Sequence, residues 1–120
     1  MMRAGNSLTA SIATLELRTR IRRERLEECL AGLAFELCIE GLPAEAVFQR
    51  LHDKAFERMV RMLDKETLDD VVALKGCLQL AADESQRVAL EALEKGTEML
   101  HDGLEILEHG DDTNKDGSVN

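Results

Sequence analysis

Residues 44–65 carry apolar side chains at the spacing of an α-helix, and this pattern constrains the fold more strongly than any other part of the sequence. The apolar positions are Val47, Leu51, Ala55, Phe56, Met59, Val60, Met62 and Leu63. At about 100° per residue they cover an arc of roughly 220°, whereas an ordinary surface helix buries a stripe of about 100° or slightly more. We therefore expect a helix that is covered by the core of its own chain and also by a binding partner.

The composition predicts an all-α protein. The chain of 120 residues has three aromatic residues, all phenylalanine, and a single proline, Pro43. Leucine and alanine dominate, which favours helices, and no useful length alternates apolar and polar residues as a strand does. We expect a small bundle of about four helices in one domain over residues 1–109, followed by a polar, flexible tail over 110–120.

Breaks in the pattern divide the chain into four expected helices. Gly41–Leu42–Pro43 marks the strongest boundary, because glycine commonly follows a helix end and proline commonly opens the next helix. The first helix is expected over about 7–40, either continuous or interrupted in its arginine-rich middle. A third helix is expected over about 67–82, apolar nearly all round, and a fourth over about 83–108, opened by the polar run Asp83–Glu84–Ser85.

The charge is strongly acidic overall but unevenly distributed. The formal net charge of -9 argues against a general affinity for nucleic acid. The first 25 residues nevertheless hold six arginines against Glu16 and Glu24, five of them within 18–25. Either neighbouring glutamates pair with these arginines on a solvated helix, or an acidic patch on a partner does.

These patterns together nominate a partner-binding surface. On the helix over 44–65 we expect an apolar contact with a polar histidine within it, which is either a partner contact or satisfied inside the protein. The predicted contact residues are Phe48, Leu51, His52, Phe56, Met59 and Met62. Arg18, Arg22 and Arg23 are expected to steer the partner electrostatically.

A row of small residues lies in the middle of the apolar side of the last helix. Ala89, Gly96 and Gly103 are seven residues apart, and glycine inside a helix costs about 1 kcal/mol relative to alanine. Close approach of another helix would explain them. That helix belongs either to the same chain or to a second copy, so this row is also the expected seam of a homodimer.

No catalytic residue, cofactor or metal site is predicted. Glu98 and His101 have the spacing of one pair of di-iron ligands, but they lie toward the polar edge of their helix. An EF-hand-like spacing occurs near the end of the sequence, at Asp112, Asn114, Asp116, Gly117 and Val119. The bidentate glutamate of such a loop is missing, so we expect a chance resemblance rather than a calcium site.

Cysteine usage and hydropathy indicate the compartment. Cys29, Cys38 and Cys77 are odd in number and lack the CxxC spacing, so we expect small buried thiols in a reducing environment. The first 15 residues are a poor signal peptide, and no apolar run approaches the roughly 20 residues of a membrane span. We expect a cytoplasmic protein that contacts neither membrane nor nucleic acid directly.

The run from Met1 to Leu63 resembles the small bacterial antiactivators of LuxR-type quorum-sensing regulators in length, helical make-up and general sequence character. The resemblance implies a dimeric, non-enzymatic protein that binds such a transcription regulator and prevents the regulator's dimerisation and DNA binding. The family offers no motif to transfer residue by residue. An alternative function for a small, acidic, dimeric helical protein is that of a chaperone for an exported or assembling protein.

Overall fold

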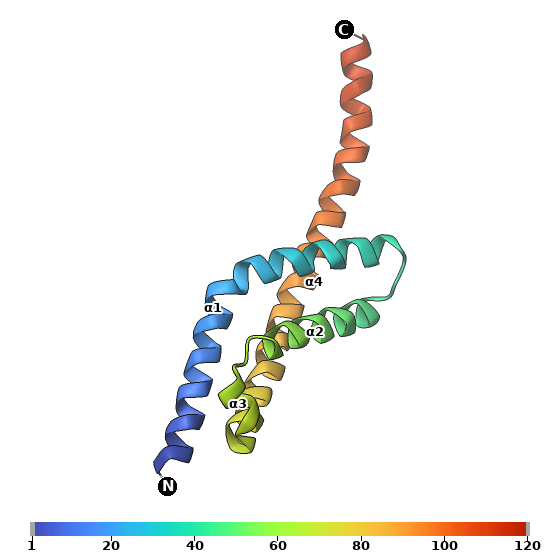
Figure 1. Ribbon diagram of the computed structural model, residues 1–120. Helices are drawn as coiled ribbons and strands as arrows, with labels where there is room; N and C mark the ends of the chain where they lie inside the picture. The colour runs from blue at the N-terminus through green and yellow to red at the C-terminus, as the bar shows by residue number, and fades with distance from the viewer. Residues whose placement is uncertain (1, 120) are drawn as a thin grey trace.

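The structure, a computed structural model, describes the backbone of residues 2–119 and the side chains of residues 8–108. The described chain forms α1 (Met2–Ile39), α2 (Ala44–Val60), α3 (Lys65–Asp69) and α4 (Val71–Val119), as Figure 1 shows. The prediction of an all-α protein with about four helices is therefore confirmed. The two long terminal helices form the framework, since α1 and α4 share the most extensive contact.

The first helix is continuous but not straight. Figure 1 shows α1 changing direction about half-way along its length. Its first half runs beside the start of α4, and its second half crosses α4. The short helix α2 then returns to pack against both α1 and α4, while α4 continues well beyond the crossing (Figure 1).

The boundary predicted at residues 41–43 is confirmed. Gly41 has a φ of 91°, in the left-handed region that glycine adopts without steric cost. Its N–H donates to the Cys38 carbonyl, and the N–H of Leu42 donates to the Leu37 carbonyl, which is the Schellman pattern that ends many helices. Pro43 follows in an extended conformation directly before α2.

The boundary predicted at Asp83–Glu84–Ser85 is wrong, because these residues lie inside α4. The Ser85 hydroxyl donates to the Ala82 carbonyl, at 3.0 Å, within the helix, and Glu84 faces an arginine of α1. The actual start of α4 is set by Asp70, whose carboxylate accepts from the N–H groups of Val72 and Ala73. This polar run therefore lies within a helix, where Glu84 pairs with α1 and Ser85 bonds within α4.

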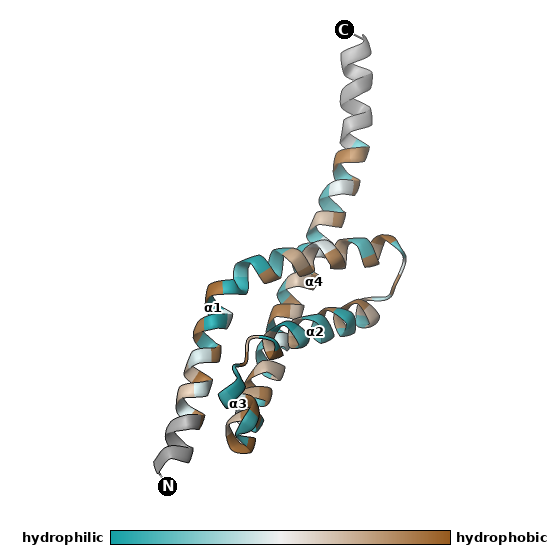
Figure 2. Cartoon of the chain, viewed as in Figure 1, coloured by the Kyte–Doolittle hydropathy of each residue, from teal (hydrophilic) through white to brown (hydrophobic). Residues whose placement is uncertain are grey.

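The core is aliphatic and is shared by α1, α2 and α4. Its larger members are Leu15, Leu26, Leu30, Leu37, Val47, Leu51, Met59 and Val88, with Ala34, Ala55, Ala81, Ala89 and Ala92 where helices approach closely. Figure 2 shows brown apolar segments alternating with teal hydrophilic ones along these helices. No helix within the described residues is long and apolar enough to cross a membrane.

Candidate functional site

The wide apolar arc of α2 is covered mainly by the chain itself. Leu51 and Met59, which were predicted to contact a partner, have no exposed surface, so that prediction is wrong for both residues. The reason is that α2 lies against two helices at once, with α4 and α1 each covering part of the arc. A helix buried on two sides carries a wide apolar face without needing a second protein.

The remaining apolar residues of the predicted surface are half-buried, and they lie apart from one another. Phe48, Phe56 and Met62 pack against the edge of the core. Phe48 lines an open groove between α2 and α4 together with Leu90 and Leu93. Met62 lies instead in a cleft between α1 and α2.

His52 is held by the interior of the protein. Its Nε2 atom lies 3.2 Å from the hydroxyl oxygen of Ser85, and its Nδ1 atom lies 4.0 Å from a carboxylate oxygen of Asp53. The Ser85 hydroxyl also lies within hydrogen-bond distance of the Ala82 carbonyl, to which it can donate at 3.0 Å. Because Ser85 has no exposed surface, its contact with His52 joins α2 to α4 inside the protein.

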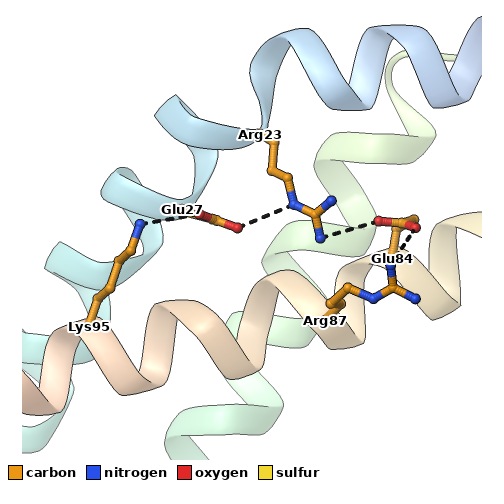
Figure 3. A network of polar contacts seen from close by, with 5 residues as sticks. All are labelled: Arg23, Glu27, Glu84, Arg87 and Lys95. Atoms are coloured by element: carbon orange, nitrogen blue, oxygen red, sulfur yellow. Dashed lines mark hydrogen bonds and ion pairs between the residues drawn. The ribbon is translucent and has the colours of Figure 1, made fainter.

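Two of the three predicted steering arginines also serve the fold. Arg18 donates a hydrogen bond from Nη1 to the Met62 carbonyl, just beyond the end of α2. Arg23 lies 3.3 Å from Glu27 and 3.5 Å from Glu84 of α4, as Figure 3 shows. These two arginines hold α1 against its neighbours, and a steering role for them stays a prediction.

A polar network joins α1 to α4 (Figure 3). Glu27, only 7% exposed, accepts from Arg23 and from the Lys95 ammonium at 3.2 Å. Burial disfavours its charge, but hydrogen bonds from Glu91, Lys95 and Arg23 outweigh burial and hold the pKa of Glu27 below its usual value. The same shared hydrogen bond raises the pKa of Glu91, so Glu91 is the carboxyl of this pair that retains its proton more readily.

The main candidate site is a cleft between α1 and α2, which we call the arginine cleft. It has a volume of about 470 Å³ and is lined by Arg22, Arg25, Leu26, Cys29, Arg58, Arg61 and Met62. Two arginines come from α1 and two from the end of α2. The cleft therefore combines positive charge from both helices with an apolar part.

Most of the positive charge in the arginine cleft is not neutralised. Arg61 lies 2.6 Å from Glu57. Among residues with described side chains, Arg22, Arg25 and Arg58 have no ion-pair partner. Guanidinium groups bind carboxylates with two parallel hydrogen bonds, so the cleft is suited to an acidic ligand that also has apolar groups.

The arginine cleft contains one predicted steering residue, Arg22, and one predicted contact residue, Met62. The arginines of α2 were missed because they are more than 30 residues away from the basic segment in the sequence. A signal was present nevertheless. Arg22 and Arg25, and likewise Arg58 and Arg61, are three residues apart, which places each pair on one face of its helix.

Cys29 is exposed in the arginine cleft, so the prediction of a buried thiol is wrong for this residue, whereas Cys77 is buried. Burial raises the pKa of the Cys77 thiol. Glu98 and His101 lie on the surface as expected. No group of three or more potential metal ligands is found among the described residues, and the EF-hand-like residues 112–119 lie outside the described side chains.

The three residues of the predicted dimer seam, Ala89, Gly96 and Gly103, do not form one exposed surface. A Cβ atom at Gly96 would lie 2.6 Å from the Cβ of Ala34 and 2.9 Å from the carbonyl oxygen of Ala31, so this glycine serves the contact between α1 and α4. Ala89 is fully buried in the same chain. The seam prediction is therefore wrong for Ala89 and Gly96, while nothing lies within 4 Å of a Cβ placed on Gly103.

Comparison with known proteins finds no matching protein family, no similar characterised protein and no matching solved structure. The function therefore has to be argued from the chemistry of the arginine cleft and the surfaces beside it.

Proposed function

We propose that this protein is a non-enzymatic regulator that acts by binding another protein through the arginine cleft. The observation that carries the proposal is the convergence of four arginines from two helices, three of them without an ion-pair partner among the described side chains. Placing like charges together costs free energy in the unbound protein. An acidic partner removes that cost, which favours binding over an inert role for the cleft.

A protein segment suits the cleft better than nucleic acid does. The chain has a net charge of -9, so a long polyanion lying across its surface would be repelled outside the cleft. Leu26 and Met62 add apolar surface beside the arginines. The matching ligand is an amphipathic protein segment with carboxylates flanking apolar side chains.

The resemblance of residues 1–63 to antiactivators of LuxR-type quorum-sensing regulators suggests the target. In that case the protein binds the ligand-binding domain of the regulator and occupies the surface through which the regulator dimerises. A regulator kept monomeric loses its two-fold DNA contact, so DNA binding fails without this protein touching DNA. A cytoplasmic protein that self-associates remains part of this proposal.

Binding measurements with charge-reversed variants test the proposal. Arg58→Glu combined with Arg22→Glu is expected to weaken binding to the regulator's ligand-binding domain at least about 100-fold, because two attractive charges become repulsive. Arg20→Glu combined with Arg50→Glu is the matched control, since both arginines are exposed and lie outside the cleft. Isothermal titration calorimetry gives the dissociation constants, and light scattering gives the regulator's oligomeric state.

Equal binding by the cleft variant and the control variant would contradict the role of the arginine cleft. Failure of the wild type to bind the regulator domain would reject the antiactivator function. Capture of an exported protein by the exposed apolar side chains of α4, among them Leu104 and Leu107, would favour the chaperone alternative instead. Circular dichroism confirms that each variant retains its helices.

A further inference from the structure

Residues 97–108 of α4 form a second exposed feature, which we call the α4 overhang. Figure 1 shows α4 leaving the body of the molecule after it crosses α1. Among the residues with described side chains, Gly96 is the last that is buried, and every residue from 97 to 108 is exposed or half-exposed. The α4 overhang therefore leaves most of its helical surface available for contact, although Glu98, Met99 and Asp102 at its start line an open groove with Glu28 and Ala31 of α1.

The α4 overhang is amphipathic. At about 100° per residue, one side carries Met99, Leu100, Leu104, Ile106 and Leu107. Four of these five side chains are exposed, with Ile106 and Leu107 exposed by 68% and 66%. Asp102 borders this apolar side on one edge and Glu108 on the other. The apolar side continues the face through which Gly96 contacts α1.

Charge argues against pairing of two overhangs with each other. The α4 overhang contains Glu98, Asp102, Glu105 and Glu108 but no lysine or arginine. Two such helices packed through their apolar sides would place carboxylates along the same edges, and like charges at that distance repel. The apolar side of the overhang is therefore better covered by a basic surface than by the overhang of a second copy.

The arginine cleft supplies such a basic surface. Arg22 and Arg25 lie on α1, Arg58 and Arg61 lie on and just after α2, and the lining also includes the apolar side chains of Leu26 and Met62. An amphipathic helix with acidic edges suits this cleft, because its carboxylates can pair with the arginines and its apolar side can contact the apolar lining. The overhang of the same chain cannot reach the cleft by folding back, because α4 is one continuous helix through Gly96 and the overhang.

We infer that the α4 overhang of a second copy of this chain occupies the arginine cleft. This inference rests on the proposed function, because the cleft is the same site, and it adds a means of regulation. Self-association and binding of the acidic partner segment exclude each other. The protein at high concentration is then held in a self-occupied form, and the partner has to compete for the cleft.

A charge-exchange experiment tests the inference. Analytical ultracentrifugation of the wild type should show reversible, concentration-dependent association that weakens with salt. Arg22→Glu combined with Arg25→Glu removes the basic half of the contact, and Glu98→Lys combined with Asp102→Lys removes the acidic half. Each variant alone is expected to have a self-association constant at least about tenfold weaker than that of the wild type.

An equimolar mixture of the two variants provides the decisive observation. The reversed charges are complementary again, so the mixture should form a hetero-complex that neither variant forms alone. Glu16→Lys, on an exposed position of α1, is the control and should associate like the wild type. Circular dichroism and melting temperatures verify that all variants are folded.

Several outcomes would overturn the inference. They are a wild type that stays monomeric at all concentrations, variants that associate as tightly as the wild type, and a mixture that forms no hetero-complex. Partner binding distinguishes this failure from failure of the proposed function. The overhang variant should bind the acidic partner at least as tightly as the wild type. Loss of partner binding by the cleft variant supports the proposed function even if the protein does not self-associate, and retained binding would contradict the proposed function.

Discussion

At the scale of single residues, the crossing of α1 and α4 requires a position without a side chain at Gly96. Gly96 lets the helices approach until its Cα faces the backbone of α1, with the Ala31 carbonyl oxygen and the Phe35 nitrogen within 3.1 Å of a Cβ placed there. The sequence indicated a close helix approach at this glycine. It could not indicate whether the second helix came from the same chain, since a row of small residues looks alike in both cases.

Gly96→Ala is expected to lower the free energy of unfolding by about 1–3 kcal/mol, because the added methyl group meets backbone atoms that cannot move aside. Gly32→Ala is the matched control in α1, where nothing lies within 4 Å of the new Cβ. It should raise stability by up to about 1 kcal/mol through helix propensity. Urea unfolding followed by circular dichroism measures both, and equal effects of the same sign would contradict the close contact.

The carboxyl pair Glu27 and Glu91 predicts two opposite dependences on pH. The pKa of Glu27 is lowered, so its stabilising contribution is present above the ordinary glutamate pKa of about 4.3 and is lost as the pH falls through its lower folded value. The pKa of Glu91 is raised, so its contribution is present at low pH and is lost as the pH rises through its folded value.

Substitutions separate these two contributions. Glu27→Gln should destabilise the protein most near neutral pH, with a difference from the wild type that shrinks toward pH 3. Glu91→Gln keeps a hydrogen-bond donor that does not titrate, so this variant should gain stability over the wild type as the pH rises. Urea unfolding between about pH 3 and pH 7 measures the differences, and pH-independent differences for both variants would contradict the shared proton.

At the scale of elements, the helix ends that depend on local backbone chemistry could be predicted from the sequence. The helix ends that depend on contacts with other helices could not. Gly41 and Pro43 act within a few residues of their own positions, so the end of α1 was predictable. The run 83–85 looked like a helix start because it is polar. It lies inside α4, where Arg23 of α1 pairs with Glu84, a contact that sequence spacing does not show.

Asp70 defines the true start of α4 and predicts a stability effect. Its carboxylate accepts from two backbone N–H groups of the first turn. Asp70→Ala should therefore cost about 0.5–2 kcal/mol, while Asp70→Ser or Asp70→Asn should retain most of the stability. Asp69→Ala is the control, because Asp69 is exposed and no cap hydrogen bond joins it to α4. Equal loss in both alanine variants would argue against the cap.

At the scale of the whole molecule, the sequence could nominate basic and apolar residues but not their assembly. Arg22 lines a cleft with arginines of another helix, whereas Arg18 and Arg23 in the same segment hold the fold. The excess apolar surface placed on α2 is mostly core. The exposed apolar surface lies instead on the α4 overhang, because no other helix of the chain extends that far (Figure 1).

The most direct test of the central claim, that a partner protein binds in the arginine cleft, uses the exposed thiol of Cys29 as a reporter. Cys29 lines the cleft, and Cys38 is a partly exposed thiol outside it. The measurement is the rate of iodoacetamide alkylation at each cysteine, followed by mass spectrometry, with and without a saturating regulator ligand-binding domain. The protein concentration is kept below that of self-association.

The bound partner is expected to slow alkylation of Cys29 at least about tenfold, because a segment seated between the arginines covers the thiol. Alkylation of Cys38 should continue at its rate in the free protein. A saturated complex in which Cys29 reacts as fast as it does in the free protein would contradict the claim, because the partner would then bind elsewhere.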